Sequence, residues 1–464
     1  MVQLLYCMAD NKIWTPKLTP SNKPLYLQIV DALAHDISEG RLSIGDKLPP
    51  QRQLAWHLNI NHSTVTKAFQ QAAKQHLIAG EVGRGTYVLG QSAEAELFNL
   101  KQFTQKKNID LSTHVPIYNQ DNNDLEESLN ALTQSTEGVN QYLEYPSRHT
   151  LSTINLAAAK WLTQLGYSIA AKQCIVTTAA QNALFVSLLN SCKKDEVILV
   201  DEFTFPGMKA IAKQLELKLY GIKMDEQGIT PEELDLAIRT TGAKVLVSDP
   251  TWQNPTATSM GKARQQAIIE VICHRKILFI EEYVIGALSN NPPISATIKS
   301  QSVLITSFAK AVSPGVRFAV IAGEHNLITQ LSHESHITSW QLSPLMAKIA
   351  CLWIDKGITK ARQTWQRTEI NKRYALYKKL FPDHNYPYNK TVCSHVWLPV
   401  TLSGEEACEQ LALKGVTVVP ASLFAVGRNI SQFIRVSLTA AKSQQELNVA
   451  LTILKNSQLI AAEN

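Results

Sequence analysis

The stretch Ser302–Gly323, SVLITSFAKAVSPGVRFAVIAG, decides the fold of the longer part of this chain. It begins as a buried strand and places a lysine, Lys310, shortly after the strand ends. Four other β-rich apolar runs precede it, separated by helical stretches: EVILVDE, KLYGIKMD, AKVLVSDP and KILFIEEY. Strands that alternate with helices predict an α/β domain with a mainly parallel sheet.

Length and composition set the general class of the protein. A chain of 464 residues exceeds what one hydrophobic core usually organises, so we expect at least two domains. A net charge of +6 permits a polyanionic partner without requiring one. Seven scattered cysteines with no C-x-x-C pair favour free thiols over disulfides, and we expect no metal site. No apolar run reaches the ~20 residues that cross a bilayer, so we expect a cytoplasmic protein without a membrane span.

Residues 20–90 form a compact pattern of their own. The segments PPQRQLAWHLN and HSTVTKAFQQAAKQH have helix-turn-helix spacing, with Pro49 and Pro50 suited to open the first helix and Ser63 and Thr64 to cap the second. LIAGE and TYVLG flank the turn VGRG and predict a hairpin. The sequence therefore predicts an α+β winged helix, followed by a polar linker over residues 91–108.

In a helix-turn-helix, the start of the second helix enters the major groove, and a basic wing tip approaches the minor groove. Val65, Ala68 and Phe69 are expected to face inward. The candidate DNA contacts are Arg52, His62, Ser63, Thr64, Thr66, Lys67, Gly83, Arg84 and Gly85.

From Pro24 to Val88 the sequence resembles the GntR-type winged-helix transcription regulators. The resemblance implies that these residues contact operator DNA, although His62 stands where the family commonly has arginine. The alternative is a winged helix used only for protein contacts, which would leave its polar recognition face and basic wing without a purpose.

The second candidate site surrounds Lys310. A lysine at the carboxyl end of a strand in an α/β domain lies where ligands bind, and a partly desolvated amine forms a Schiff base with a carbonyl. Ser307 and Arg317 suit a phosphate close to the same point. An aldehyde that also carries a phosphate is pyridoxal 5'-phosphate, which needs a carboxylate opposite its ring nitrogen as well.

Other residues supply the remaining parts of such a site. Glu281 and Tyr283 are two residues apart on one strand face, so we expect them to meet the ring nitrogen and the phenolic oxygen, with Asn254 donating to that oxygen. The backbone amides of Ala179, Ala180 and Gln181 begin a helix and would seat the phosphate. Phe205 is predicted to stack on the ring, and Arg435 to bind the carboxylate of a substrate or effector.

From about Ile109 to the C-terminus the chain resembles fold-type I aminotransferases, and the whole chain resembles the MocR subfamily of GntR regulators. The resemblance implies a domain over 109–464, with a large part to about 345 and a small C-terminal lobe over about 346–464. It also implies a homodimer. The family usually has aspartate at Glu281, tyrosine at Phe205 and glycine at Ala179 or Ala257.

Three functions follow from these two sites. The leading one is a transcription regulator whose C-terminal domain binds pyridoxal phosphate through Lys310 and senses an amine, an amino acid or the cofactor itself. The second is an active aminotransferase that carries a DNA-binding module. The third is a domain that has lost the cofactor and serves only to dimerise.

Overall fold

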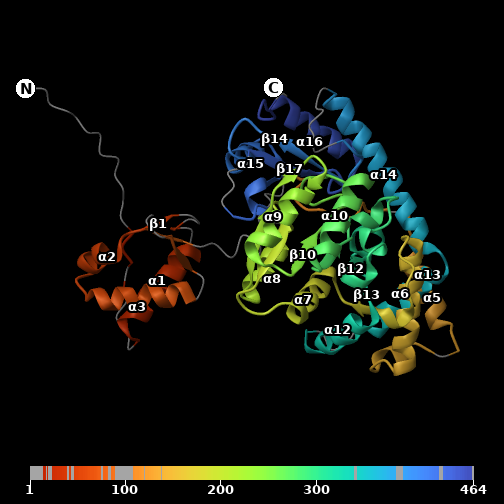
Figure 1. Cartoon of the computed structure of the whole chain (residues 1–464). Coiled ribbons are helices and arrows are strands. Elements are labelled where there is room, and N and C mark those ends of the chain that lie inside the picture. The colour runs from red at the N-terminus through yellow and green to blue at the C-terminus, as the bar shows by residue number, and fades with distance from the viewer. Residues whose placement is uncertain are drawn as a thin grey trace, which may run out of the picture. The chain divides into compact units, whose positions relative to one another are not determined.

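The computed structural model describes residues 14–16, 18, 23–38, 41–42, 46–74, 77–81, 85–88, 108–119, 121–136, 138–338, 342–382, 390–427 and 432–461. The chain divides into two compact units, residues 1–101 and 102–464. Each is described by itself (Figure 1).

The N-terminal unit is a winged helix, as the sequence predicts. It contains α1 (Leu25–Ser38), α2 (Gln51–Leu58), α3 (His62–Lys74), and an antiparallel sheet in the order β1 (Lys47–Leu48), β3 (Gly85–Val88), β2 (Ile78–Glu81). Val65, Ala68 and Phe69 face the core of this unit, together with Leu33 and Leu54. The predicted inward face of α3 is therefore confirmed.

The turn between α2 and α3 is formed differently from the sequence-based expectation. Asn59 ends α2 in the left-handed conformation, with φ of 49°. Asn61 then caps α3, because its Oδ1 accepts the backbone N–H of Ser63 at 3.1 Å. Ser63 and Thr64 lie inside the first turn, so the prediction that they cap this helix is wrong.

The C-terminal unit is built on a seven-stranded sheet in the order β5-β13-β12-β11-β10-β6-β7. All neighbours are parallel except β13, which is antiparallel to both of its partners. The strands are β5 (Cys174–Thr177), β6 (Val197–Asp201), β7 (Lys218–Ile222), β10 (Val245–Ser248), β11 (Leu278–Glu282), β12 (Ser302–Ser307) and β13 (Ala319–Gly323).

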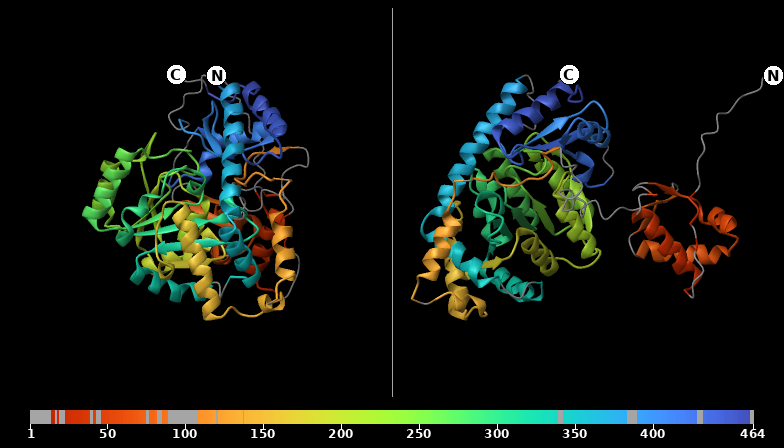
Figure 2. Two further views of the ribbon diagram at one scale, coloured as in Figure 1. Left: turned by 90° about the vertical axis from the view of Figure 1, so that its right-hand side faces the viewer. Right: turned by 180° about the vertical axis from the view of Figure 1, so that it is seen from behind.

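Helices cover both faces of this sheet (Figures 1 and 2). One face packs against α7 (Ala180–Ser191), α8 (Pro206–Gln214) and α12 (His325–Thr338). The other packs against α6 (Arg148–Gln164), α9 (Pro231–Thr241), α10 (Lys262–Arg275) and α13 (Pro344–Asp355). We call these the α7 face and the α10 face.

Strand alternation assigns individual residues to these two faces. Val247 of β10 and Ile280 of β11 join the core on the α7 face. Leu246 and Phe279, one position earlier, join the core on the α10 face. The side on which each polar residue at the strand ends projects follows from this assignment.

A small lobe follows in the chain. It contains a three-stranded sheet in the order β14 (His395–Pro399), β17 (Phe433–Ser437), β16 (Val419–Pro420), covered by α15 (Gly404–Leu413) and α16 (Gln444–Asn456). A parallel pair, β4 (Ile109–Asp110) and β15 (Val416–Thr417), ties the beginning of the domain to this lobe. Leu111 is accordingly buried in the small-lobe core.

The 23-residue helix α14 (Ile358–Leu380) connects the two cores. Ile370 belongs to the core of the large part, whereas Tyr374 and Tyr377 belong to that of the small lobe. The helix runs along the domain from α16 to α13 (Figures 1 and 2). Since α13 packs on α6 in the large part, the small lobe begins within α14 and not at residue 346.

The remaining elements are short or peripheral, and no helix of the described residues is long and apolar enough to span a bilayer. They are α5 (Asp124–Thr133), α11 (Phe308–Ala311), β8 (Met224–Asp225), β9 (Gly228–Ile229), and the 3-10 helices at Asn140–Leu143, Ala171–Gln173, Gly286–Leu288, Ile294–Ala296, Lys299–Gln301 and Ala421–Leu423.

Candidate functional site

Lys310 lies on the single-turn helix α11, directly after β12 and at the carboxyl edge of the sheet. Ser307 starts this turn, and its hydroxyl accepts the backbone N–H of Ala309 at 3.3 Å. The Lys310 ammonium donates to the backbone carbonyl of His114. The lysine is thus held between the large part and a segment that arrives from the start of the domain.

Arg435 on β17 of the small lobe reaches the same place. Its Nη1 donates to Oδ1 of Asn254 at 2.7 Å, and its Nη2 donates to the carbonyl of Ser112 at 2.5 Å. The guanidinium lies over the ring of Phe424, at 4.7 Å from the centroid. Burial lowers the pKa of Arg435 to about 10, which leaves it charged at neutral pH.

Residues 112–116, which we call the strap, therefore contact both candidate ligand-binding cations. The strap is anchored at one end, where Leu111 N donates to Thr417 O at 2.8 Å and Ser437 N to Leu111 O at 2.9 Å. At the other end, the amide of Gln366 on α14 makes two hydrogen bonds with the backbone of Ile117, at 3.0 and 2.7 Å. An anionic ligand that binds Lys310 or Arg435 would compete with the strap carbonyls for these cations.

Two buried histidines complete this basic side. The rings of His114 and His395 lie 5.5 Å apart, and Nε2 of His395 is 3.1 Å from the carbonyl of Gln253. Burial, and then the positive charge of Arg435, lowers the pKa of His395 to about 3. Burial and the charges of Lys310, His395 and Arg435 hold the pKa of His114 well below its usual value. Among the described residues, His114 Nδ1 and Arg435 Nε are buried without a hydrogen-bond partner.

The predicted phosphate residues gather at one corner of the sheet. Thr177, Ala319 and Ser307 are register partners across β5, β13 and β12. Helix α7 begins at Ala180 immediately after β5, so its free amides open towards this corner. Arg317 lies two residues before Ala319 in the left-handed conformation, with φ of 54°, and its side chain is exposed.

Phe205 and Gln181 meet next to that corner. Phe205 precedes α8, and Nε2 of Gln181 donates to the carbonyl of Gly207 at 3.0 Å. A Cβ on Gly207 would lie 2.3 Å from both Gln181 Oε1 and Phe205 Cε1, so these two side chains would have to shift to admit one. The aromatic ring and the first turn of α7 are thereby held together.

Glu281 and Tyr283 are placed differently from the sequence-based expectation. The carboxylate oxygens of Glu281 accept the backbone amides of Ile294 at 3.0 Å and Ser295 at 2.8 Å, and the residue is fully buried. The Tyr283 hydroxyl donates to the carbonyl of Asn291, and its ring is buried in the core beside α6. Both residues share one strand face, as predicted, but it is the α10 face, and their polar atoms are engaged there.

Three further carboxylates lie at the ends of β6, β10 and β11. Asp201 accepts Ser248 Oγ at 2.7 Å, Asp249 N at 3.3 Å and Gln253 Nε2 at 3.3 Å. Burial raises the pKa of Asp201 to about 6. Burial, and then the charge of Asp201, raises the pKa of Glu282 to about 7. Burial and three neighbouring carboxylates raise the pKa of Asp249 well above its usual value.

These residues fit pyridoxal phosphate. The chain supplies an amine at Lys310, free helix amides at Ala180, an aromatic side chain at Phe205 and an amide at Asn254. Asp249 Oδ1 is a buried acceptor with no hydrogen-bond partner among the described residues, which suits a protonated ring nitrogen. The described residues contain no group of three or more His, Cys, Asp or Glu side chains arranged to hold a metal ion.

In the N-terminal unit, the candidate DNA contacts Arg52, His62, Ser63 and Lys67 are exposed. The Lys67 ammonium lies 4.3 Å from the ring centroid of Tyr26, which orients it. Thr64 is half-buried.

Thr66 is half-buried, and its hydroxyl donates to Gln51 Oε1 at 2.9 Å, so it joins the two helices. Gly85 has φ of 121°, and a Cβ there would lie 2.7 Å from Lys47 Cε. Gly83 and Arg84 lie outside the described residues.

Sequence reasoning missed Ser112, His114, His395, Asp249 and Glu282. The last two carry a local signal, since each is an acidic residue at or directly after the carboxyl end of an apolar strand. The two histidines carry none, because 281 positions separate them in the chain and only the fold brings them together.

Comparisons with known proteins agree with both units. The family described as "Bacterial regulatory proteins, gntR family" matches residues 25–88, and "Aminotransferase class I and II" matches residues 106–454. An archaeal alanine:glyoxylate aminotransferase has the same fold, with a TM-score of 0.71 at 18% identity over 80% of this chain and 96% of its own.

Two relatives match nearly end to end. The HTH-type transcriptional regulator YdeF of Bacillus subtilis is 28% identical over 95% of this chain and 96% of its own length. The vitamin B6 salvage pathway transcriptional repressor PtsJ of Salmonella typhimurium is 22% identical over 92% of this chain and 97% of its own length. The chain belongs to the class I and II aminotransferase family and carries a GntR-family winged helix before the aminotransferase domain. This is the domain arrangement of MocR-type regulators.

Proposed function

We propose that this protein is a DNA-binding transcription regulator whose aminotransferase-like domain binds pyridoxal phosphate at Lys310 and senses an amine, an amino acid or the cofactor itself. The observation that carries the proposal is the strap. Its carbonyls contact Lys310 and Arg435, and the chain continues from its start into the segment that leads to the winged helix.

The residues of the site have distinct tasks. When bound, the cofactor supplies an aldehyde that condenses with the Lys310 amine and releases water. Lys310 must then give up its hydrogen bond to the His114 carbonyl. Arg435 would bind a ligand carboxylate, and doing so competes with its bond to the Ser112 carbonyl.

A ligand that breaks both contacts frees the strap between its two anchors. A ligand shifts a conformational equilibrium only by its unequal affinity for the two states, and loss of two charge-assisted hydrogen bonds supplies such a difference. The strap directly follows β4, and the residues before β4 lead along the sequence to the DNA-binding unit.

The DNA-binding function is supported by the exposed polar start of α3. His62, Ser63 and Lys67 project from the helix that enters the major groove in this class of domain. Arg52 on α2 suits a phosphate contact.

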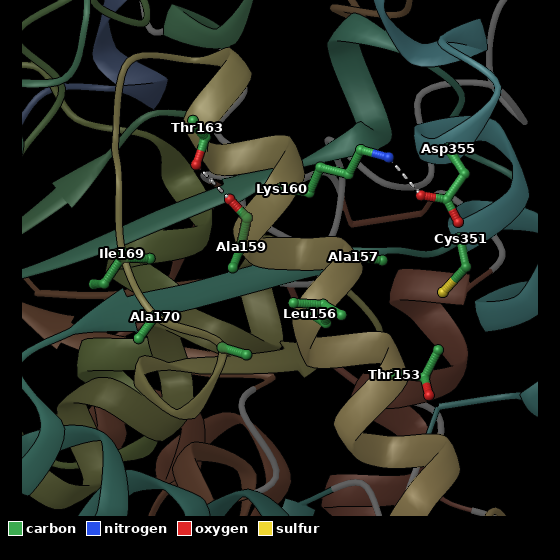
Figure 3. Close-up of a pocket in the computed structure, with 11 residues that line it drawn as sticks. Thr153, Leu156, Ala157, Ala159, Lys160, Thr163, Ile169, Ala170, Cys351 and Asp355 are labelled. Atoms are coloured by element: carbon green, nitrogen blue, oxygen red, sulfur yellow. Dashed lines mark hydrogen bonds and ion pairs between the residues drawn. The ribbon is translucent and has the colours of Figure 1, made fainter.

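A homodimer is part of the proposal. Leu143, Tyr145 and Leu156 are 84%, 80% and 63% exposed, and Leu125 and Leu129 of α5 add to the apolar surface of this part of the chain. Leu156 lies on α6 beside a groove that Thr153, Lys160 and Asp355 also line (Figure 3). Exposed apolar side chains in such number favour a protein interface. Static light scattering should give the mass of two chains, and a single-chain mass would contradict the dimer.

The test measures DNA binding as a function of site occupancy. A duplex selected by the protein from a random pool is titrated by fluorescence anisotropy, without and with pyridoxal phosphate and then with a panel of amines. We expect visible absorption from the bound cofactor and a severalfold change in affinity for DNA. Both should be absent in Lys310→Ala and retained in Lys193→Ala, a change at an exposed lysine.

The same preparation separates the other two functions. Multiple turnovers of an amino acid with a keto acid would favour an active aminotransferase, which the buried Arg435 and the half-buried Lys310 also suit. A protein that takes up no cofactor at all would contradict the proposal and leave the domain as a dimerisation scaffold.

A further inference from the structure

His114 lies on the strap, and one nitrogen of its ring makes no hydrogen bond. The residue is 8% exposed, and Nδ1 is buried without a hydrogen-bond partner among the described residues. Its backbone carbonyl accepts the Lys310 ammonium, and the carbonyl of Ser112, two residues earlier, accepts Arg435. The two carbonyls of the strap are therefore engaged, whereas Nδ1 is not. A buried polar atom in this state gains a hydrogen bond when a ligand supplies the partner.

The surroundings of the His114 ring are basic. After burial, the groups that lower its pKa by their positive charge are Lys310 on α11, His395 on β14 and Arg435 on β17. The His395 ring lies 5.5 Å away, but its Nε2 is 3.1 Å from the carbonyl of Gln253 and is engaged there. Nε of Arg435 is, like Nδ1 of His114, buried without a partner among the described residues. A ligand with negatively charged acceptor atoms fits these surroundings.

A carboxylate that reaches Arg435 would change the protonation of His114. In the ligand-free protein, burial and the neighbouring cations hold the pKa of His114 well below its usual value, so the ring is neutral at pH 7. A carboxylate offsets the charge of Arg435, and an opposite charge in contact with an imidazole favours its protonated form. The protonated ring carries an N–H on both nitrogens, so Nδ1 is then a donor.

We infer that His114 is a ligand-recognition residue whose Nδ1 donates to the carboxylate of a ligand bound at Arg435, and whose ring takes up a proton as that ligand binds. The inference rests on the role proposed for Arg435 and does not depend on the cofactor. It gives the strap a second way to be held, because the ligand replaces the Ser112 carbonyl at Arg435 and is itself bound by His114.

Proton uptake makes the affinity for the ligand depend on pH. Because the complex binds one proton more than the free protein, the affinity should fall as the pH rises, by up to about tenfold per pH unit where the uptake is complete. A residue that only supports the fold would lower the affinity without this dependence.

The probe is propionate, a carboxylate without an amine, which cannot condense with a carbonyl group. Its binding to the full chain is measured by titration calorimetry near pH 6, in two buffers of different ionisation enthalpy, which gives the number of protons taken up per ligand. We expect an uptake of about one proton in the unmodified protein. Propionamide, the uncharged analogue, should bind more weakly and without proton uptake.

Variants at one position separate the hydrogen bond from the proton. His114→Gln should weaken propionate binding by about tenfold or more and abolish the uptake. His114→Asn keeps an N–H donor close to the position of Nδ1 but cannot titrate, so it should retain part of the affinity and lose the uptake. The matched control His274→Gln, at an exposed histidine of α10, should behave like the unmodified protein.

The outcomes separate the inference from the proposed function. The inference is overturned if the unmodified protein does not bind propionate or binds it without proton uptake, or if the uptake persists in both His114 variants. If one variant does not fold, the other decides by the same measurement. Visible absorption of the same samples reports the cofactor independently. A coloured protein without proton uptake would keep the proposed cofactor and lose the inference, and a colourless protein with uptake that depends on His114 would do the reverse.

Discussion

The candidate site has a basic side and an acidic side, and the two are completed differently. On the basic side, Lys310 and Arg435 donate to carbonyl and amide oxygens of the strap and of Asn254. On the acidic side, Glu281 is satisfied by backbone amides, whereas Oδ1 of Asp249 is buried without a hydrogen-bond partner among the described residues. The basic groups are held by contacts that a ligand can displace, whereas Asp249 lacks a contact that a ligand can supply.

The largest expected effect comes from Asp201, whose carboxylate accepts three hydrogen bonds. Asp201→Ala removes the acceptor of Ser248, Gln253 and the Asp249 amide, all buried or half-buried. We expect the free energy of unfolding of this domain to fall by about 3 kcal/mol, measured by denaturant titration. The exposed Glu270→Ala should change it by less than about 0.5 kcal/mol. If Asp201→Ala and Glu270→Ala lowered the free energy of unfolding equally, the hydrogen bonds of Asp201 would not stabilise this domain.

The second prediction concerns the basic side at low pH. The folded pKa of His395 is about 3, below its usual 6.5, so the unfolded chain takes up a proton that the folded chain refuses. Stability present above pH 6.5 is therefore lost as the pH falls, by about 2–3 kcal/mol at pH 4. Comparison of denaturation curves should show a shallower loss in His395→Gln, and an unchanged loss in the exposed control His274→Gln. An unchanged loss of stability in His395→Gln, with a shallower loss in His274→Gln, would contradict the assignment of the lowered pKa to His395.

The third prediction is smaller and has the opposite sign. The folded pKa of Glu282 is about 7, above its usual 4.5, so the folded chain binds more protons between these values. Stability present below pH 4.5 is lost as the pH rises through 7, by about 1–2 kcal/mol in the ligand-free protein. Glu281 and Asp201 add to this trend, since the pKa of each is raised to about 6. Glu282→Gln should flatten the curve above pH 5, and an unaltered slope would argue against a raised pKa of Glu282 in the folded protein.

Much of this architecture follows from local sequence. The helix-turn-helix spacing, the alternation of strands and helices, and the position of Lys310 after β12 depend on neighbours in the chain. The direction in which the side chains of β11 project does not follow from local sequence. Glu281, Glu282 and Tyr283 are consecutive polar residues, and a period of two shows that Glu281 and Tyr283 share a face without showing which face α7 covers.

The small-lobe boundary and the two histidines also depend on long-range packing. The sequence of α14 has no break at the point where its buried residues pass from one core to the other. His114 and His395 lie next to Arg435 because the start of the domain folds back onto the small lobe, a contact that no local pattern encodes.

Helix α14 also limits how the domain can move. Ile370 and Tyr374 are one turn apart yet anchor in different cores, and between them the buried Arg373 donates to the carbonyls of Leu438 and Ala441, each at 2.9 Å. A wide rotation of one lobe would have to bend this turn and break its backbone bonds. Helix α14 is therefore expected to stay straight when a ligand binds. The response to the ligand is expected as short displacements of the strap.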